Sequence, residues 1–200
     1  MLLIQVKPTL ERKKMEITLS DVAGVVFLVG YIPYFWSMFK GDTEPIKVSW
    51  FIWAAVDWVS LVGMNNKGSI TGLSIAAPIG ATITAFLSLK YGVPGWSKWD
   101  IGALCFAALG IPLALIMQDA NVSILINAVV VFVGSYPTFD SVWHEPQREN
   151  KWTWMLYFTA CVIALCAIPE WTIEHAAQTV SFSMTETIMV YLVLLRPRPK

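Results

Sequence analysis

The sequence has little charge: Asp, Glu, Lys and Arg make up 14% of its 200 residues, whereas soluble domains carry about 25%. Its three cysteines, Cys105, Cys161 and Cys166, show no C-x-x-C or Cys/His spacing, and we interpret them as small core residues. Nucleophile-elbow, phosphate-loop and metal motifs are absent, so we expect no enzyme, no cofactor and no metal. Fourteen basic residues balance fourteen acidic ones, so nothing indicates nucleic acid as a partner.

Apolar residues dominate instead, at 56% of the chain with a mean hydropathy of +0.59. A helical crossing of a bilayer takes about 20 apolar residues, and seven crossings would leave too few residues for a soluble catalytic domain. The segments between the apolar stretches hold nearly all the charge, and no Lys or Arg lies within a stretch. The sequence therefore predicts an all-α membrane protein with seven transmembrane helices. The stretches are 22–39, 48–64, 70–89, 101–117, 122–139, 152–168 and 176–195.

We interpret residues 1–20 as a polar N-terminal tail and 196–200 as a basic C-terminal tail. The opening segment does not resemble a secretory signal, because its apolar run 1–4 is short and the basic cluster at 12–14 follows that run. Met15, which directly precedes the first span, is a hypothetical alternative start.

The distribution of basic residues predicts the orientation. Nine lie on the side of the first, third and fifth loops and the C-terminus, and five on the other side. Because cytoplasmic loops carry an excess of Lys and Arg, the N-terminus is predicted outside and the C-terminus in the cytoplasm. A bacterial cytoplasmic membrane is the expected location.

An internal repeat appears when the sequence is compared with itself at an offset of 104 residues. Ten identities fall within the forty positions 25–64, and they include Gly, Pro, Lys and Trp. We therefore predict two parallel three-helix repeats, 21–90 and 121–195, joined by a loop and linker helix over 91–120. The identical pairs are Val25/Val129, Val26/Val130, Val29/Val133, Gly30/Gly134, Pro33/Pro137, Phe35/Phe139, Ser37/Ser141, Lys47/Lys151, Trp50/Trp154 and Leu61/Leu165.

The repeat resembles the PQ-loop superfamily, which includes SWEET sugar facilitators, lysosomal amino-acid transporters and the KDEL receptor. The segments that carry the resemblance are Gly-Tyr-Ile-Pro-Tyr at 30–34 with Ser-Trp at 49–50, and Gly-Ser-Tyr-Pro-Thr at 134–138 with Thr-Trp at 153–154. Tyr34 and Thr138 stand where the family has Gln, and Pro78 and Ser183 lie nearest to the Asn that the sugar carriers use. The layout is closest to uncharacterised bacterial members, and the departures do not favour a sugar as the solute.

The resemblance implies a carrier that works by alternating access, with a solute bound between the repeats near the bilayer midplane. Pro33 and Pro137 would then act as hinges, because a proline inside a helix removes a backbone hydrogen bond and bends the helix. A static bend is the alternative interpretation. Gly30 and Gly134 on the same helices allow close helix approach.

Two acids lie within predicted spans, Asp57 and Glu186, and we expect both to face the interior because an ionised carboxylate is costly in lipid. They are candidates for contacting the solute or a proton, with a hydrogen-bonded structural role as the alternative. Helical spacing places Trp53 on the face of Asp57, and Ser183 on the face of Glu186.

The fifth span presents a polar stripe that includes Asn127 and Thr138 and could line a cavity at the repeat interface. Trp53 beside Asp57 would suit an organic cation. The expected function is thus a small-solute carrier with the lipid bilayer and an unknown solute as partners, and with a proton or a second copy of the chain as further candidates. The alternative is a non-transporting receptor or assembly partner that acts through the charged segment 143–152.

Overall fold

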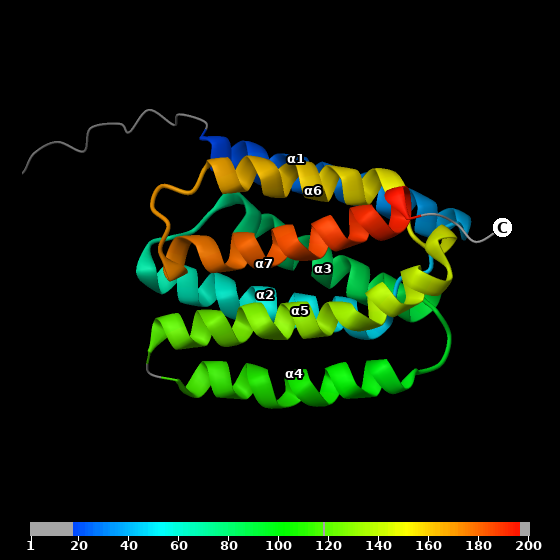
Figure 1. The fold of residues 1–200 in the computed structure, drawn as a ribbon, viewed down its shortest axis with the longest axis horizontal. Coiled ribbons are helices and arrows are strands. Elements are labelled where there is room, and N and C mark those ends of the chain that lie inside the picture. The colour runs from blue at the N-terminus through cyan, green and yellow to red at the C-terminus, as the bar shows by residue number, and fades with distance from the viewer. Residues whose placement is uncertain (1–17, 118, 197–200) are drawn as a thin grey trace, which may run out of the picture.

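The computed structural model of the chain describes residues 18–117 and 119–196 (Figure 1). The predicted tails lie largely outside these residues, as does Met15, and the first helix begins at Leu19, inside the segment predicted as tail. A 3-10 turn, η1 (Pro146–Arg148), precedes the sixth helix, and a π-helical turn, η2 (Tyr191–Leu195), continues the seventh. The helices are α1 (Leu19–Lys40), α2 (Lys47–Lys67), α3 (Gly72–Tyr91), α4 (Lys98–Ile116), α5 (Ala120–His144), α6 (Lys151–Cys166) and α7 (Ile173–Val190).

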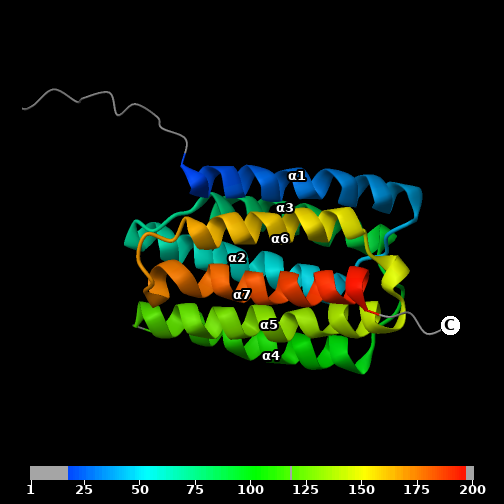
Figure 2. The ribbon, with the colours of Figure 1, turned by 45° about the horizontal axis from the view of Figure 1, so that its top comes forward.

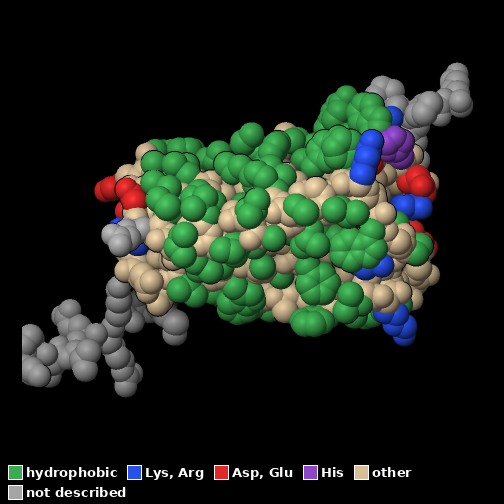
Figure 3. All heavy atoms as spheres, turned by 90° about the horizontal axis from the view of Figure 1, so that it is seen from below, with side chains coloured by type: hydrophobic (Ala, Val, Ile, Leu, Met, Phe, Trp, Pro, Cys, Tyr) green, Lys and Arg blue, Asp and Glu red, His purple; other side chains and the backbone are tan. Residues whose placement is uncertain are grey.

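Six of these helices, α1 to α5 and α7 with its continuation, are long and apolar enough to cross a membrane. The remaining one, α6, has 16 residues; it is about 24 Å long, shorter than the roughly 30 Å hydrocarbon core. Figure 3 shows hydrophobic side chains over the middle of the molecule and charged ones toward its two ends. The chain is therefore a multi-pass membrane protein, and its regular secondary structure within residues 18–117 and 119–196 is all helical.

Polar caps and glycines determine where several helices begin and end. Thr18, Thr71 and Ser97 each form a capping box with the residue three positions later, and α1, α3 and α4 start directly after them. Gly41 and Gly68 end α1 and α2 with φ angles of 79° and 68°, a left-handed conformation that glycine adopts without a Cβ penalty.

The helices lie side by side along the long axis of the molecule (Figures 1 and 2). Helix α3 packs against both α1 and α2, and α7 packs against both α5 and α6. Contacts of α1 with α6 and of α2 with α5 join these two groups of three. Helix α4 covers the outside, where it packs against α5 and α2. The interior that results is surrounded by every helix except α4.

Helix α1 approaches the start of α3 so closely that only glycine fits. A Cβ added to Gly24 would lie 2.5 Å from the backbone oxygen of Gly72. We expect Gly24→Ala to lower the free energy of unfolding by about 1 to 3 kcal/mol, because a backbone clash cannot be relieved by a side-chain rotation. Thermal unfolding in detergent measures the effect.

The matched control is Gly63→Ala in α2, where an added Cβ meets nothing within 4 Å. This change should be neutral or stabilising by up to about 1 kcal/mol, since alanine restricts the unfolded chain more than glycine does. Equal melting temperatures for the two variants would contradict the close approach of α1 and α3.

Candidate functional site

A small cavity lies in the interior between the two groups of three helices. Its volume is about 40 Å³, enough for a water molecule or a ligand of comparable size. Side chains from all helices except α4 form its wall, so the cavity joins segments far apart in the chain. The lining residues are Phe27, Tyr31, Trp50, Trp53, Asp57, Ala77, Ala81, Val131, Trp154, Tyr157, Phe182, Thr185 and Glu186.

Both intramembrane acids line this cavity, Asp57 from α2 and Glu186 from α7. They are 3% and 6% exposed, and no Lys, Arg or His is among the residues of the wall. Asp57 Oδ1 and Glu186 Oε2 have no hydrogen-bond partner within the described part of the chain. An ionised carboxylate at the centre of a bilayer costs about 2.5 to 3.5 kcal/mol or more, so a proton or a cation must balance each charge.

Three further buried polar atoms in the same wall make no hydrogen bond of good geometry among the residues described: Trp50 Nε1, which lies near the Tyr34 hydroxyl, Tyr157 Oη, which lies near the Tyr31 hydroxyl, and Thr185 Oγ1. Buried polar groups in folded proteins almost always have a partner, and each exception calls for an explanation. Five such atoms line one cavity, which makes this cavity the candidate site for a polar or charged ligand.

Aromatic rings make up the rest of the wall and hold one another in place. The ring centroids of Phe27 and Tyr157 lie 4.4 Å apart, and those of Trp50 and Trp53 lie 4.8 Å apart. Trp53 Nε1 donates to Ser135 Oγ over 3.1 Å, which fixes that ring against α5. Seven of the thirteen lining residues are aromatic, so aromatic side chains make up most of the wall that contains the two carboxyl groups.

The structure brings together only part of the site predicted from sequence. Asp57, Trp53 and Glu186 line the central cavity. Asn127 lines a separate hollow of about 20 Å³, and Thr138 is fully buried in α5 without lining the central cavity.

Ser183 is half-buried on α7, where its hydroxyl donates to the Thr179 carbonyl oxygen over 2.7 Å. It therefore bonds within its own helix, and it is absent from the central wall.

Sequence reasoning missed several wall residues, above all Tyr31, Tyr157 and Thr185. Tyr157 corresponds to Trp53 at the offset of 104 residues, and Trp53 was predicted as a site residue. The repeat could therefore have been used to predict Tyr157 as well. Tyr31 lies inside the Gly-Tyr-Ile-Pro-Tyr segment but differs from its counterpart Ser135. Nothing in the sequence singles out Thr185.

The prolines and glycines of the repeat lie as predicted inside α1 and α5. A Cβ on Gly30 would lie 2.6 Å from the Tyr157 ring, and one on Gly134 would lie 2.7 Å from the Ile52 side chain. Both glycines thus allow helices of different groups to approach closely, as membrane helix interfaces require.

A third acid, Glu149, is buried just before α6, outside the membrane-spanning helices, and is 7% exposed. One carboxyl oxygen accepts a hydrogen bond from Trp154 Nε1 over 2.9 Å, and the other accepts one from the Tyr34 hydroxyl over 3.2 Å. Burial raises the pKa of Glu149 to about 8, although both hydrogen bonds act to lower this pKa. Nothing in the sequence distinguishes Glu149 from the other charged residues of its loop.

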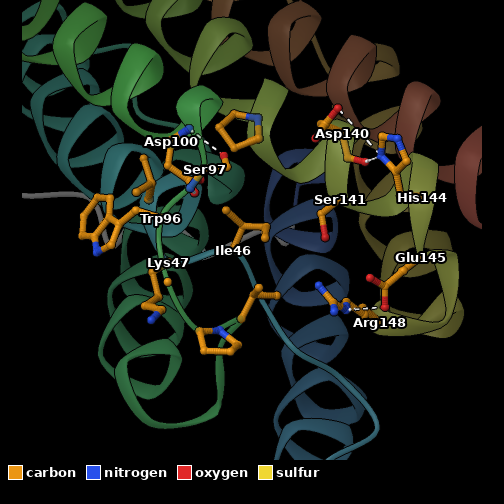
Figure 4. A pocket seen from close by; sticks show the side chains of 15 residues that line it. Ile46, Lys47, Trp96, Ser97, Asp100, Asp140, Ser141, His144, Glu145 and Arg148 are labelled. Atoms are coloured by element: carbon orange, nitrogen blue, oxygen red, sulfur yellow. Dashed lines mark hydrogen bonds and ion pairs between the residues drawn. The ribbon is translucent and has the colours of Figure 1, made fainter.

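A larger cavity of about 440 Å³ opens at the same end of the molecule (Figure 4). It lies between the start of α2, the α3–α4 connection and the end of α5. Arg148 Nε pairs with Glu145 over 2.9 Å, and His144 Nδ1 lies 3.8 Å from an Asp140 oxygen. Charges of both signs largely neutralise each other here, unlike the acids of the central cavity.

Comparison of the chain with models of known families, with characterised proteins and with solved structures found no match.

Proposed function

We propose that this chain is a small-solute carrier that works by alternating access between two three-helix repeats, in a PQ-loop-like arrangement. The observation that carries the proposal is the central cavity, where two acids and three other buried polar atoms without hydrogen bonds of good geometry meet between the halves. Solute sites of carriers built from repeats lie near the midplane at the repeat interface. Helix α4 would be the linker between the repeats.

Equivalent packing in the two halves supports the repeat. Helix α3 lies against α1 and α2 as α7 lies against α5 and α6. Gly30 approaches Leu156, and Gly134 approaches Ile52. The two contacts correspond to each other, because the offset of 104 residues relates Gly30 to Gly134 and Ile52 to Leu156.

Side chains at the interface follow the same symmetry. The ring of Tyr31 lies 5.0 Å from that of Tyr157, and the counterparts of these residues, Ser135 and Trp53, are joined by a hydrogen bond of 3.1 Å. The α1–α6 and α2–α5 interfaces thus use residues at corresponding positions of the two proposed repeats, which supports the repeat. Such a pair of interfaces is what a rocking motion about a central site requires.

In this proposal the structure corresponds to a closed state, because the cavity of about 40 Å³ has room for only a small ligand. Bends at Pro33 and Pro137 would open the cavity to one side and then to the other. The distribution of basic residues supports an N-terminus outside and a C-terminus in the cytoplasm of a bacterial cell.

Cysteine labelling tests alternating access without knowledge of the solute. In a variant in which Cys105, Cys161 and Cys166 are replaced by alanine, Thr185→Cys places a single thiol in the cavity wall. We expect a membrane-impermeant thiol reagent to label it in both right-side-out and inside-out vesicles. Ala160→Cys is the control, because Ala160 is buried outside the cavity. Labelling from one side only, or from neither, would contradict the proposal.

A reversible disulfide between the two groups of helices tests whether their relative movement opens the cavity. The Glu44 amide donates to the Arg148 carbonyl oxygen over 2.9 Å, and this bond joins the two groups of helices at one end. A disulfide between Glu44→Cys and Arg148→Cys should abolish labelling of Thr185→Cys from that side, and reduction should restore it. The control pair, Pro45→Cys and Val93→Cys, replaces residues joined by a 3.1 Å backbone hydrogen bond next to α2 and α3, and it should leave labelling unchanged.

The cavity in Figure 4 favours a second candidate function, that of a receptor or assembly partner. His144, Glu145 and Arg148 in its wall belong to the charged segment 143–152. This function predicts that Arg148→Gln abolishes partner binding whereas Asp57→Asn does not. If the protein is a carrier, Asp57→Asn should abolish transport and Arg148→Gln should not.

A further inference from the structure

We propose that the central cavity binds a compact organic ammonium ion and exchanges it for a proton; this inference rests on the proposed carrier function and names its solute class. The proposal follows from what surrounds Asp57 and Glu186. The wall of the cavity restricts the charge, the size and the hydrogen-bonding groups that a ligand can have.

The acidic wall of the cavity excludes anionic ligands. Among the described residues, the wall contains two carboxyl groups and no Lys, Arg or His. The titratable groups near the acids from the packed elements are Tyr31 on α1, Tyr157 and Cys161 on α6, and Glu149 just before α6. Helices α3 and α5 give only the apolar side chains of Ala77, Ala81 and Val131 to the wall. A cation is therefore the one ligand charge that the wall balances.

The aromatic wall favours an organic cation over a metal ion. A positive charge is attracted to the faces of Trp, Tyr and Phe rings, and amine-binding proteins surround their ligands with such rings. Metal ions instead require several oxygen, nitrogen or sulfur ligands around one point. No group of three or more His, Cys, Asp or Glu side chains suitable for a metal occurs among the described residues.

The hydrogen-bonding atoms and the size of the cavity restrict the class of organic cation that it can bind. Four of the five atoms without hydrogen bonds of good geometry, on Asp57, Glu186, Tyr157 and Thr185, can accept hydrogen bonds from the N–H groups of an ammonium ion. The cavity of about 40 Å³ has no room for a sugar or an amino acid in this state. A primary ammonium group on a very short carbon chain fits these limits.

Exchange for a proton follows from the charge balance. When the cation leaves, a carboxylate in this wall would remain without a counter-charge in a desolvated site. A proton taking its place restores neutrality. Binding is then written as one ammonium ion and one carboxyl group giving a carboxylate–ammonium pair and one released proton, with no other reactant.

Methylammonium chloride is the first ligand to test, with the full-length protein in detergent and weak buffer. Because a ligand with two non-hydrogen atoms makes few contacts, we expect a dissociation constant of about 10 mM or weaker. We expect saturable quenching of tryptophan fluorescence and release of about one proton per bound cation, read with a pH indicator. Sodium chloride at equal ionic strength and methanol, a neutral ligand of equal size, should produce neither signal.

Variants identify the groups involved. Asp57→Asn and Glu186→Gln should each weaken methylammonium binding at least tenfold, and Glu170→Gln, at an exposed position, should not change it. If a variant fails to fold, the comparison of methylammonium with sodium chloride and methanol on the wild-type protein still tests the proposal. The proposal is wrong if methylammonium gives no saturable signal, if methanol or sodium chloride gives the same signal, or if no proton is released.

The two proposals fail separately. Labelling of Thr185→Cys from both sides without methylammonium binding would keep the carrier and reject the ammonium class. Methylammonium binding with labelling from one side only would keep the cation site and reject alternating access.

Discussion

Replacement of Trp154 by alanine is expected to lower the free energy of unfolding by about 3 to 5 kcal/mol. Trp154 is 1% exposed, and its ring lies 5.7 Å from Tyr157 and 6.5 Å from Trp53 between ring centroids. In a membrane the loss does not arise from exposure to water, because lipid is as apolar as the protein interior. It arises from lost van der Waals contacts around the cavity that alanine leaves.

The substitution also removes the Nε1–H group that donates to Glu149. Trp154→Phe separates the two effects, since it keeps most of the ring but loses the donor, and it should cost about 1 to 3 kcal/mol. Reversible unfolding in mixed micelles measures both variants.

Trp152→Ala is the matched control on the same helix. Trp152 is 58% exposed, and its removal should change stability by no more than about 0.5 kcal/mol. A loss for Trp154→Ala as small as that for Trp152→Ala would show that the aromatic wall does not hold the two halves together.

Helix positions could be predicted to within a few residues because apolar length is a strong signal, and the errors have local causes. The second stretch was predicted to end at residue 64, but α2 continues through Asn65 and Asn66 to Lys67, since Gly68 is the first residue that leaves the helical conformation. The sixth stretch was predicted to end at 168, and α6 ends at Cys166, because Pro169 disfavours a helical conformation for Ile168.

The candidate site was less predictable. Asp57 and Glu186 were identified because acids are rare in spans, but that they line one cavity depends on helix rotation and tilt, which sequence spacing does not fix. Helical stripes selected Asn127, Thr138 and Ser183 equally well, yet polar residues also bond within their own helix, as Ser183 does. Aromatic wall residues such as Tyr157 carry no polar signal in so apolar a chain.

The stability of the protein is expected to fall as the pH rises from about 5 to 8, and Glu149 is the cause. Its pKa is about 8 in the folded protein and 4.5 as the ordinary value. Between these values the folded state binds a proton that the unfolded state has lost, so each pH unit costs about 1.4 kcal/mol of stability. The cost ends above the folded pKa, where both states are deprotonated.

Glu149→Gln should remove this part of the pH dependence. The amide is always neutral, and its oxygen can accept from Trp154 while its nitrogen donates to the Tyr34 hydroxyl oxygen. Melting curves from pH 5 to 8.5 should show the variant and the wild type converging at low pH, with the variant more stable at high pH. Glu145→Gln is the control, because the Glu145 side chain is 45% exposed. Parallel profiles for Glu149→Gln and the wild type would contradict the burial of a titrating carboxyl group.

The position of Glu149 gives this titration a structural consequence. Tyr34, which donates to Glu149, directly follows Pro33, and the Asn150 side chain donates to the Pro33 carbonyl oxygen over 3.5 Å. Deprotonation near pH 8 would place an unbalanced charge between α1 and α6 beside the proposed hinge. The labelling rate of any cysteine rises over this range as its thiol ionises, so each rate is first divided by the thiolate fraction of Thr185→Cys. Glu149→Gln should remove the pH dependence between 7 and 8.5 that remains in the rate of labelling from that end. A remaining pH dependence that is equal in both proteins would separate Glu149 from the opening of the cavity.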